Sequence, residues 1–156
     1  MKGFDSLKKD DKKLLDLLQN KDACTPRITF LARKMGLPTS TVQAKLDKFE
    51  KEGYIQGYSA ELDPEKVEKS LVAFKFVRKK FQKPEDMHKF GEYLAKLPGV
   101  QEVYFTVGEW GFVTKWRFRD HRDYVKTIPQ IGVWSDACQG MMAPKTFKDS
   151  RKVIID

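Results

Sequence analysis

Short polar side chains gather at the start of one predicted helix, which spans residues 38–52. Ser40 and Thr41 come first on the polar side, and Gln43 follows on its flank. Small hydroxyl side chains let a helix end approach another molecule closely, and a glutamine amide can pair bidentately with an adenine edge. This chemistry is typical of a helix whose N-terminal end enters the major groove of DNA.

Basic residues surround that polar tip. The stretch 27–51 holds six basic and two acidic residues, and lysines near a groove-binding helix can neutralise phosphates. Asp47 is expected to accept from a cytosine amine or to pair with Lys48 or Lys51, because phosphates otherwise repel it. The residues predicted to contact DNA are Arg27, Arg33, Thr39, Ser40, Thr41, Gln43, Ala44, Lys45, Asp47, Lys48 and Lys51.

Two further helices and a hairpin are needed to position this surface. The run "LKKDDKKLLDLLQN" has leucines at helical spacing. Thr25 and Pro26 predict the capped start of a second helix that ends at Gly36. The stretch "YIQGYSAEL" predicts a strand pair. Three helices and a hairpin together predict a winged helix-turn-helix domain over residues 1–57.

Apolar positions recur every three or four residues in the second and third helices, as on the buried side of an amphipathic helix. Polar residues occupy the opposite side of the third helix. The positions expected to face inward are Ile28, Leu31, Met35, Val42, Leu46 and Phe49.

A different pattern follows a predicted connector of strand and short helix at residues 58–70. "LVAFKFVRKK" alternates like a strand, "PEDMHKFGEYLAKLPG" has helical spacing, and "VQEVYFTV" and "FVTKWRFR" predict two more strands. "DHRDYVKTIPQI" predicts a helix with Tyr124, Val125 and Ile128 inward, and a fourth strand follows. The order βαββαβ predicts a ferredoxin-like domain over residues 71–156, so the fold class is α+β.

Composition narrows the partners. The 156 residues carry a formal net charge of +8, which favours a polyanionic partner. The excess is +2 for residues 1–70 and +6 for residues 71–156, so the local surplus near the third helix is the stronger argument. The stretch "MKGFDSLKKDDKK" lacks the apolar core of a signal peptide, and no apolar run reaches membrane-spanning length. We therefore expect a cytoplasmic protein with no membrane partner.

Catalytic and metal-binding patterns are absent from the sequence. Cys24 and Cys138 are far apart and read as free thiols. We find no nucleophile set, no phosphate-binding glycine loop and no metal-ligand spacing. We therefore expect no cofactor, no metal and no enzymatic activity.

An ordered set of motifs resembles the Lrp/AsnC, or feast/famine, family of transcription regulators. The set comprises "LLDLLQN", "LARKMGL", "STV", "EGYIQGYSA", "LDPEKV", "AFKFV" and "LAKLPGVQEVYFTVGEWGF". The resemblance covers nearly the whole chain. It implies a homodimer or an octamer built by the C-terminal domain, binding to double-stranded DNA, and an amino-acid effector near the loop after the second strand.

That loop reads "VGEWGF", and Gly111 stands where the family usually has an aspartate. The resemblance implies an effector site at Gly108, Glu109, Trp110 and Gly111. Glu109 could receive a ligand's ammonium group in place of the aspartate, and Trp110 could form an apolar or cation–π wall. The alternative is a tight strand connection that binds no ligand.

Two other functions compete with a site-specific regulator. A nucleoid-like architectural protein would bind through phosphates with little sequence preference. Sirohaem decarboxylases share the two-domain architecture, but "GVQEVYFTVGEWGFVTKW" lacks the histidine-bearing segment expected of them.

Overall fold

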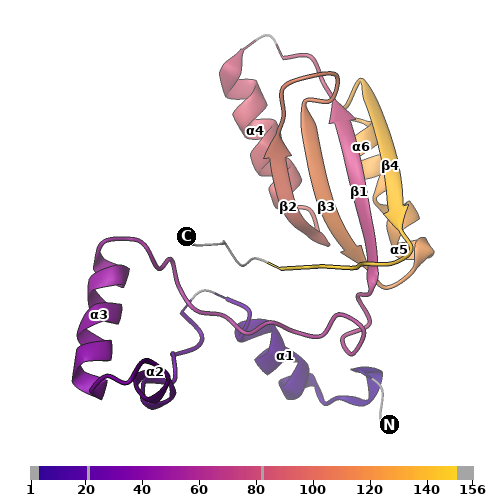
Figure 1. Ribbon diagram of the computed structural model, residues 1–156. Coiled ribbons are helices and arrows are strands. Elements are labelled where there is room, and N and C mark those ends of the chain that lie inside the picture. Colours follow the sequence, from indigo (N-terminus) through magenta and orange to yellow (C-terminus); the bar gives the residue numbers. More distant parts are fainter. Residues whose placement is uncertain (1–3, 21, 82, 151–156) are drawn as a thin grey trace. The chain divides into compact units, whose positions relative to one another are not determined.

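Three α-helices form the N-terminal part of the computed structural model, which describes residues 4–20, 22–81 and 83–150 (Figure 1). Contacts divide the chain into two units, Met1–Lys66 and Val67–Asp156. The helices of the first unit follow a short 3-10 turn, η1 (Phe4–Ser6), and are α1 (Lys9–Leu17), α2 (Ile28–Met35) and α3 (Thr39–Lys51). The three predicted helices are therefore confirmed.

The turn between α2 and α3 is fixed by two residues. Gly36 has a left-handed conformation with φ of 65° and caps α2. Pro38 is the extended N-cap residue of α3. The predicted start of α2 is wrong, because Arg27 is the N-cap residue and its carbonyl accepts the first helical bond, from Leu31 N–H at 3.1 Å.

Only part of the predicted apolar stripe is buried. Ala32 and Val42 are the buried residues of α2 and α3. Met35 and Phe49, which were expected to face inward, are 57% and 41% exposed. Phe49 packs edge-on against Tyr54, with ring centroids 5.9 Å apart. A unit of this size has few elements to cover its helices, so apolar side chains remain at its surface.

The predicted wing strands and connector helix do not form in residues 54–70. Ile55 N–H donates to Phe49 O at 3.2 Å, and Ala60 N–H donates to Leu18 O at 2.8 Å. These backbone donors therefore bond to the ends of helices rather than to a partner strand. At the connector, Asp63 Oδ1 accepts from the N–H groups of Glu65 and Lys66, which closes a turn instead of a helix.

The second unit is a four-stranded antiparallel sheet with helices on one face (Figure 1). Its spatial order is β2-β3-β1-β4, the order of a ferredoxin-like fold, so the predicted fold class is confirmed. Its elements are β1 (Leu71–Arg78), α4 (Pro84–Ala95), β2 (Val100–Phe105), β3 (Phe112–Phe118), α5 (His121–Lys126), α6 (Ile128–Gly132) and β4 (Ala137–Ala143).

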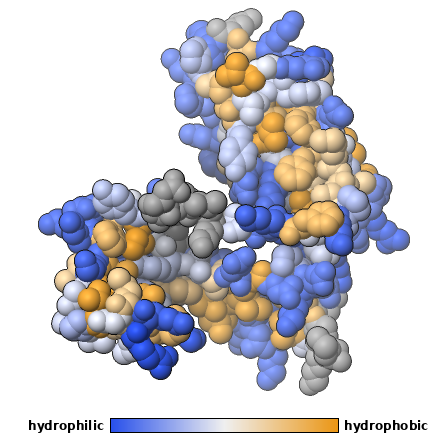
Figure 2. Space-filling model, viewed as in Figure 1, coloured by the Kyte–Doolittle hydropathy of each residue, from blue (hydrophilic) through white to orange (hydrophobic). Residues whose placement is uncertain are grey.

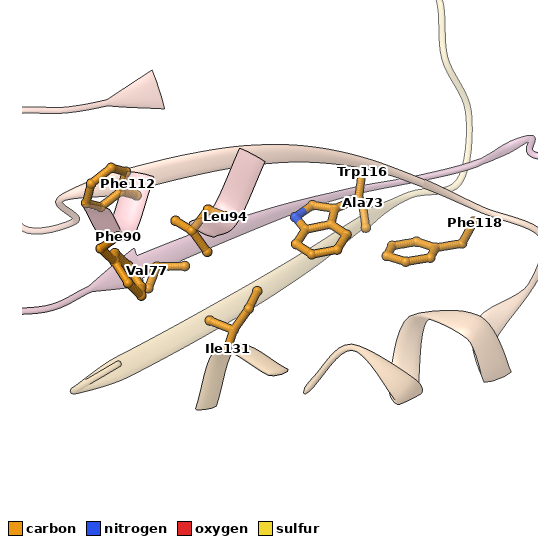
Figure 3. Packing of buried hydrophobic residues seen from close by; sticks show 8 residues of the cluster. All are labelled: Ala73, Val77, Phe90, Leu94, Phe112, Trp116, Phe118 and Ile131. Atoms are coloured by element: carbon orange, nitrogen blue, oxygen red, sulfur yellow. The ribbon is translucent and has the colours of Figure 1, made fainter. Parts of the chain in front are cut away.

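The core lies between the sheet and its helices (Figure 3). The strand register pairs Ala73 with Trp116 and Val77 with Phe112, so alternate residues of β1 and β3 share the covered face. Leu94 and Ile131 cover them from α4 and α6. The face of β1 with Val72, Phe74 and Phe76 is the opposite one, which the helices do not cover.

The last predicted helix is split in two. Pro129 has no N–H to continue α5, so the chain starts α6 around it. Ile131 is consequently the fully buried residue of this segment, whereas Val125 and Ile128 are 44% and 51% exposed. The prediction that these two face inward is wrong. Within the described part of the chain, no helix is long and apolar enough to cross a membrane.

Candidate functional site

The N-terminal end of α3 presents a polar surface. Thr39 and Ser40 are exposed, and Thr41 is half-buried. The first N–H groups of any helix lack intrahelical acceptors, and the Pro38 side chain at the N-cap has no acceptor atom for them. This end of α3 can therefore donate backbone and hydroxyl hydrogen bonds to an anion or to a base edge.

Gln43 and Asp47 form a pair one turn apart on the exposed side of α3. Gln43 Nε2 donates to Asp47 Oδ1 at 2.6 Å. The bond resolves the role of Asp47 in the free protein, because the carboxylate is paired with Gln43 rather than with Lys48 or Lys51. Ala44 lies between them, and its small exposed side chain keeps this surface open.

The basic residues predicted to meet phosphates are all exposed. Lys48 Nζ lies 3.8 Å from Glu52 Oε1, a weak surface pair at that exposure. Lys45 and Lys51 form no ion pair with any residue in the described ranges. Arg27 and Arg33 are exposed at the two ends of α2. The structure thus brings the predicted residues together on two consecutive helices.

The chain after α3 is tied back to the helix by Tyr58. Its hydroxyl donates to Glu50 Oε1 at 3.0 Å. Partial burial, followed by the Glu50 carboxylate, raises the pKa of Tyr58. The contact holds residues 55–58 against the polar side of α3, where the sequence predicted a wing.

The predicted effector loop connects β2 to β3. Thr106 N–H donates to Gly111 O at 2.9 Å, and the Thr106 hydroxyl donates to Trp110 O, so the loop is closed at its base. Gly108 has a φ of 135°, which favours glycine. Glu109 is exposed and Trp110 is half-buried.

Arg78, at the end of β1, is the neighbour of this loop that the sequence analysis missed. Its guanidinium carbon lies 5.7 Å from the centre of the Trp110 ring and its Nη1 lies 3.7 Å from Glu109 Oε1. Trp110 also contacts Phe76 edge-on. The only sequence signal was a basic residue ending an alternating strand, and strand pairing was needed to place it beside the loop.

The uncovered face of the sheet is rich in apolar residues (Figure 2). The register brings Phe74 opposite Met141, and Met141 is 47% exposed. The Asp149 carboxylate lies against this face, with Oδ1 2.6 Å from Lys115 Nζ and Oδ2 bound to Arg117. The hydrogen bond from Lys115 holds the pKa of Asp149 below its usual range.

Lys75 lies on the opposite, covered face and is 1% exposed. Its ammonium is 4.6 Å from the Trp116 ring centre and 4.7 Å from that of Tyr124, and it donates to the Thr127 hydroxyl. Burial lowers the pKa of Lys75 to about 8. The sequence analysis did not identify this aromatic cage, although Lys75 is in phase with the buried residues Ala73 and Val77.

Nothing in the described ranges resembles a metal centre, since they hold no cluster of three or more His, Cys, Asp or Glu side chains placed to bind an ion. Cys24 and Cys138 are both free.

Comparison with known families and proteins matches both units. Residues 9–56 match the winged helix-turn-helix DNA-binding model, and residues 72–152 match the Lrp/AsnC ligand binding domain model. The chain is 30% identical over 151 residues to the HTH-type transcriptional regulator FL11 of Pyrococcus horikoshii, covering 93% of this chain and 94% of that protein.

Solved structures of regulators from the same family also match nearly the whole chain. An AsnC family transcriptional regulator from Agrobacterium tumefaciens is 25% identical with a TM-score of 0.78, over 95% of this chain and 97% of that one. The feast or famine regulatory protein from M. tuberculosis, complexed with L-methionine, is 26% identical with a TM-score of 0.70, over 94% and 99%. This chain belongs to the Lrp/AsnC family of HTH-type transcriptional regulators.

Proposed function

We propose that the protein is a DNA-binding transcription regulator that reads double-stranded DNA with the N-terminal end of α3. The observation that carries this proposal is the exposed polar tip of α3, with Gln43 one turn behind it and lysines on its flanks. A helix so built can place hydroxyl and amide groups at base edges while the lysines meet phosphates. Arg27 and Arg33 would clamp the adjacent backbone.

The uncovered sheet face supports self-association. Apolar side chains such as Phe74 and Met141 lose water contact when two copies of this face pack together. A two-fold dimer would present two helix-turn-helix units to half-sites about one helical turn apart, or a multiple of it. The proposed assembly is a homodimer, or an octamer built from such dimers.

The loop between β2 and β3 is the proposed effector site. The M. tuberculosis relative of known structure was solved with L-methionine, and the family model matched by residues 72–152 is a ligand binding domain. Gly108, Glu109, Trp110 and Gly111 would contact an amino acid that modulates DNA binding. We assign the protein no catalytic role, and we expect it to act in the cytoplasm.

One observation favours a second candidate function. Gln43 is held by Asp47, which lowers the number of free groups that can read bases. An architectural protein with little sequence preference needs only the lysines and the helix end.

A fluorescence-anisotropy titration at physiological salt distinguishes the two functions. It compares the duplex upstream of the protein's own gene with a scrambled duplex of equal composition. A preference of about a hundredfold or more supports a site-specific regulator, because it lies within or just under the range of roughly 10³–10⁷ by which specific binding usually exceeds nonspecific binding. Equal, steeply salt-dependent binding supports the architectural function. No binding to either duplex contradicts both.

A further inference from the structure

One end of the sheet, at the top of Figure 1, brings together the end of β1, the β2–β3 loop and the chain entering β4. Arg78, Lys80 and Asp136 line an open surface hollow there of about 540 Å³. Arg78 also contacts the loop through Glu109 and Trp110. The residues that line this hollow come from segments that are remote in sequence, and we call the site the Arg78 cleft.

The guanidinium of Arg78 is held in place but weakly neutralised. It lies over the face of Trp110, and Phe76 contacts the same ring edge-on. Its distance to the Glu109 carboxylate is 3.7 Å, and the two side chains are 48% and 68% exposed. Ion pairs at such exposure contribute little stability, so an incoming carboxylate can replace Glu109 at small cost.

Lys80 supplies a second positive charge to the cleft. Its ammonium makes no ion pair with any residue whose position the structure describes. Its backbone N–H donates to Asp136 Oδ2 at 2.8 Å, and Asp136 N–H donates to Arg78 O at 2.9 Å. Asp136 therefore shapes the cleft through the backbone, and its carboxylate remains in the cleft as a negative charge with which a ligand carboxylate must compete for the Lys80 ammonium.

We propose that the Arg78 cleft binds a small dicarboxylate, with one carboxylate on the Arg78 guanidinium and the other on the Lys80 ammonium. Arginine presents a planar fork that matches a carboxylate, whereas lysine binds as a point charge. Because Trp110 is engaged by Arg78 and Phe76, it orients the guanidinium and offers little open ring to an apolar ligand.

The inference deepens the proposed effector site and rests on it, since Glu109 and Trp110 belong to that loop. A dicarboxylate could be an acidic amino acid or a dicarboxylic acid without an amine. Glu109, displaced from Arg78, is free to receive an ammonium group. An acidic amino acid is therefore expected to bind more tightly than the matching diacid if Glu109 takes that role.

Isothermal titration calorimetry on the full chain tests the ligand class. The ligands are L-glutamate, glutarate, L-glutamine and L-leucine. We expect L-glutamate or glutarate to bind at least about tenfold more tightly than L-glutamine, which keeps the shape but loses one charge. Tighter binding of L-glutamate identifies the acidic amino acid as the source, and tighter binding of glutarate identifies the diacid. L-glutamine or L-leucine binding as well as either diacid overturns the proposal.

Three variants test the residues. Arg78→Gln and Lys80→Gln should each weaken dicarboxylate binding by about tenfold or more, because each removes a charge-assisted contact. Lys89→Gln is the matched control, since Lys89 is an exposed lysine on α4 outside the cleft. Dicarboxylate binding that is equal in the wild type and Arg78→Gln overturns the assignment.

DNA binding by the same preparations separates the two hypotheses. If the wild type binds its DNA but no dicarboxylate up to about 10 mM, the inference fails and the proposed regulator stands. If no DNA is bound while dicarboxylate is, the ligand inference stands and the DNA-binding proposal fails.

Discussion

Gln43 and Asp47 are joined across one turn of α3 by a 2.6 Å hydrogen bond from the amide nitrogen to the carboxylate. The bond couples the base-reading candidate, Gln43, to the carboxylate of Asp47. On DNA the amide can either keep this partner, with Asp47 fixing its orientation, or exchange it for a base edge. In both cases the free energy of reading a base depends on Asp47 as well as on Gln43.

Gln43→Ala should relax base preference at one position of the binding site. Losing a bidentate contact is expected to cost about 1–3 kcal/mol against the preferred sequence and almost nothing against random DNA. Anisotropy titrations on the two duplexes measure both values. Equal losses on the two duplexes would show that Gln43 does not read a base.

Asp47→Asn should tighten binding to every duplex. It removes a negative charge that would lie near phosphates, and two charges about 7 Å apart in water interact by roughly 0.6 kcal/mol. The asparagine can still accept from Gln43, so base preference should change less than in Gln43→Ala. A weaker complex with random DNA would mean that the carboxylate itself binds a base amine.

Lys48→Ala should weaken specific and random complexes alike. Its pairing with Glu52 at 3.8 Å is loose and exposed, so the ammonium is available to a phosphate. The slope of log affinity against log salt should become shallower by about one. Lys89→Ala, on α4 of the other unit, is the control for a general charge effect. An unchanged slope would remove Lys48 from the interface.

The helices of the proposed DNA-binding surface could be predicted because their signals are local. Gly36 marks the turn before α3 and Gly53 marks the end of the helix. The 3.6-residue spacing of apolar residues correctly predicted that Val42 is buried. The missing wing strands depend on which acceptors the backbone finds. The donors Ile55 N–H and Ala60 N–H find Phe49 O and Leu18 O, which lie earlier in the chain. The spacing of residues within 54–62 does not reveal such pairings.

The sheet shows a second limit. Both faces of β1 carry apolar residues, so alternation predicts a strand without telling which face the helices cover. The contact of Arg78 with Glu109 and Trp110 likewise depends on the pairing of β1 with β3. Residue types identified the loop as a candidate site, but only the register identified its neighbour.

Met141→Glu should prevent self-association. Met141 is 47% exposed in the single chain, so a glutamate can be solvated there without unfolding the unit. Packed against a second copy, the same carboxylate would lose its water and find no assigned partner. Light scattering should report the monomer mass for the variant and a multiple of it for the wild type.

The control for that experiment is Val133→Glu, because Val133 is 76% exposed and lies between α6 and β4, outside the sheet's uncovered face. It should keep the wild-type mass. A Met141→Glu protein that also keeps the wild-type mass would show that copies associate through another surface.

Lys75→Met should change how stability depends on pH. Burial lowers the pKa of Lys75 to about 8 in the folded chain, from 10.5 for the free side chain. Between these values the unfolded chain binds more protons than the native one, so Lys75 makes stability rise with pH there. The slope is at most about 1.4 kcal/mol per pH unit.

The free energy of unfolding of the wild type should therefore rise relative to that of Lys75→Met as pH rises from about 8 to about 9.5. Urea unfolding at both pH values measures the difference. Burial raises the pKa of Tyr124 and Cys138, so both oppose the trend in either protein. The Lys75 ammonium lowers the pKa of Cys138, so removing it raises that pKa further and adds to the relative gain of the wild type. Near pH 7 the methionine variant should be at least as stable, because a buried cation without a carboxylate partner is costly. Lys126→Met, an exposed lysine on α5, is the matched control. A difference in free energy of unfolding between wild type and Lys75→Met that does not change with pH would show that folding does not lower the pKa of Lys75.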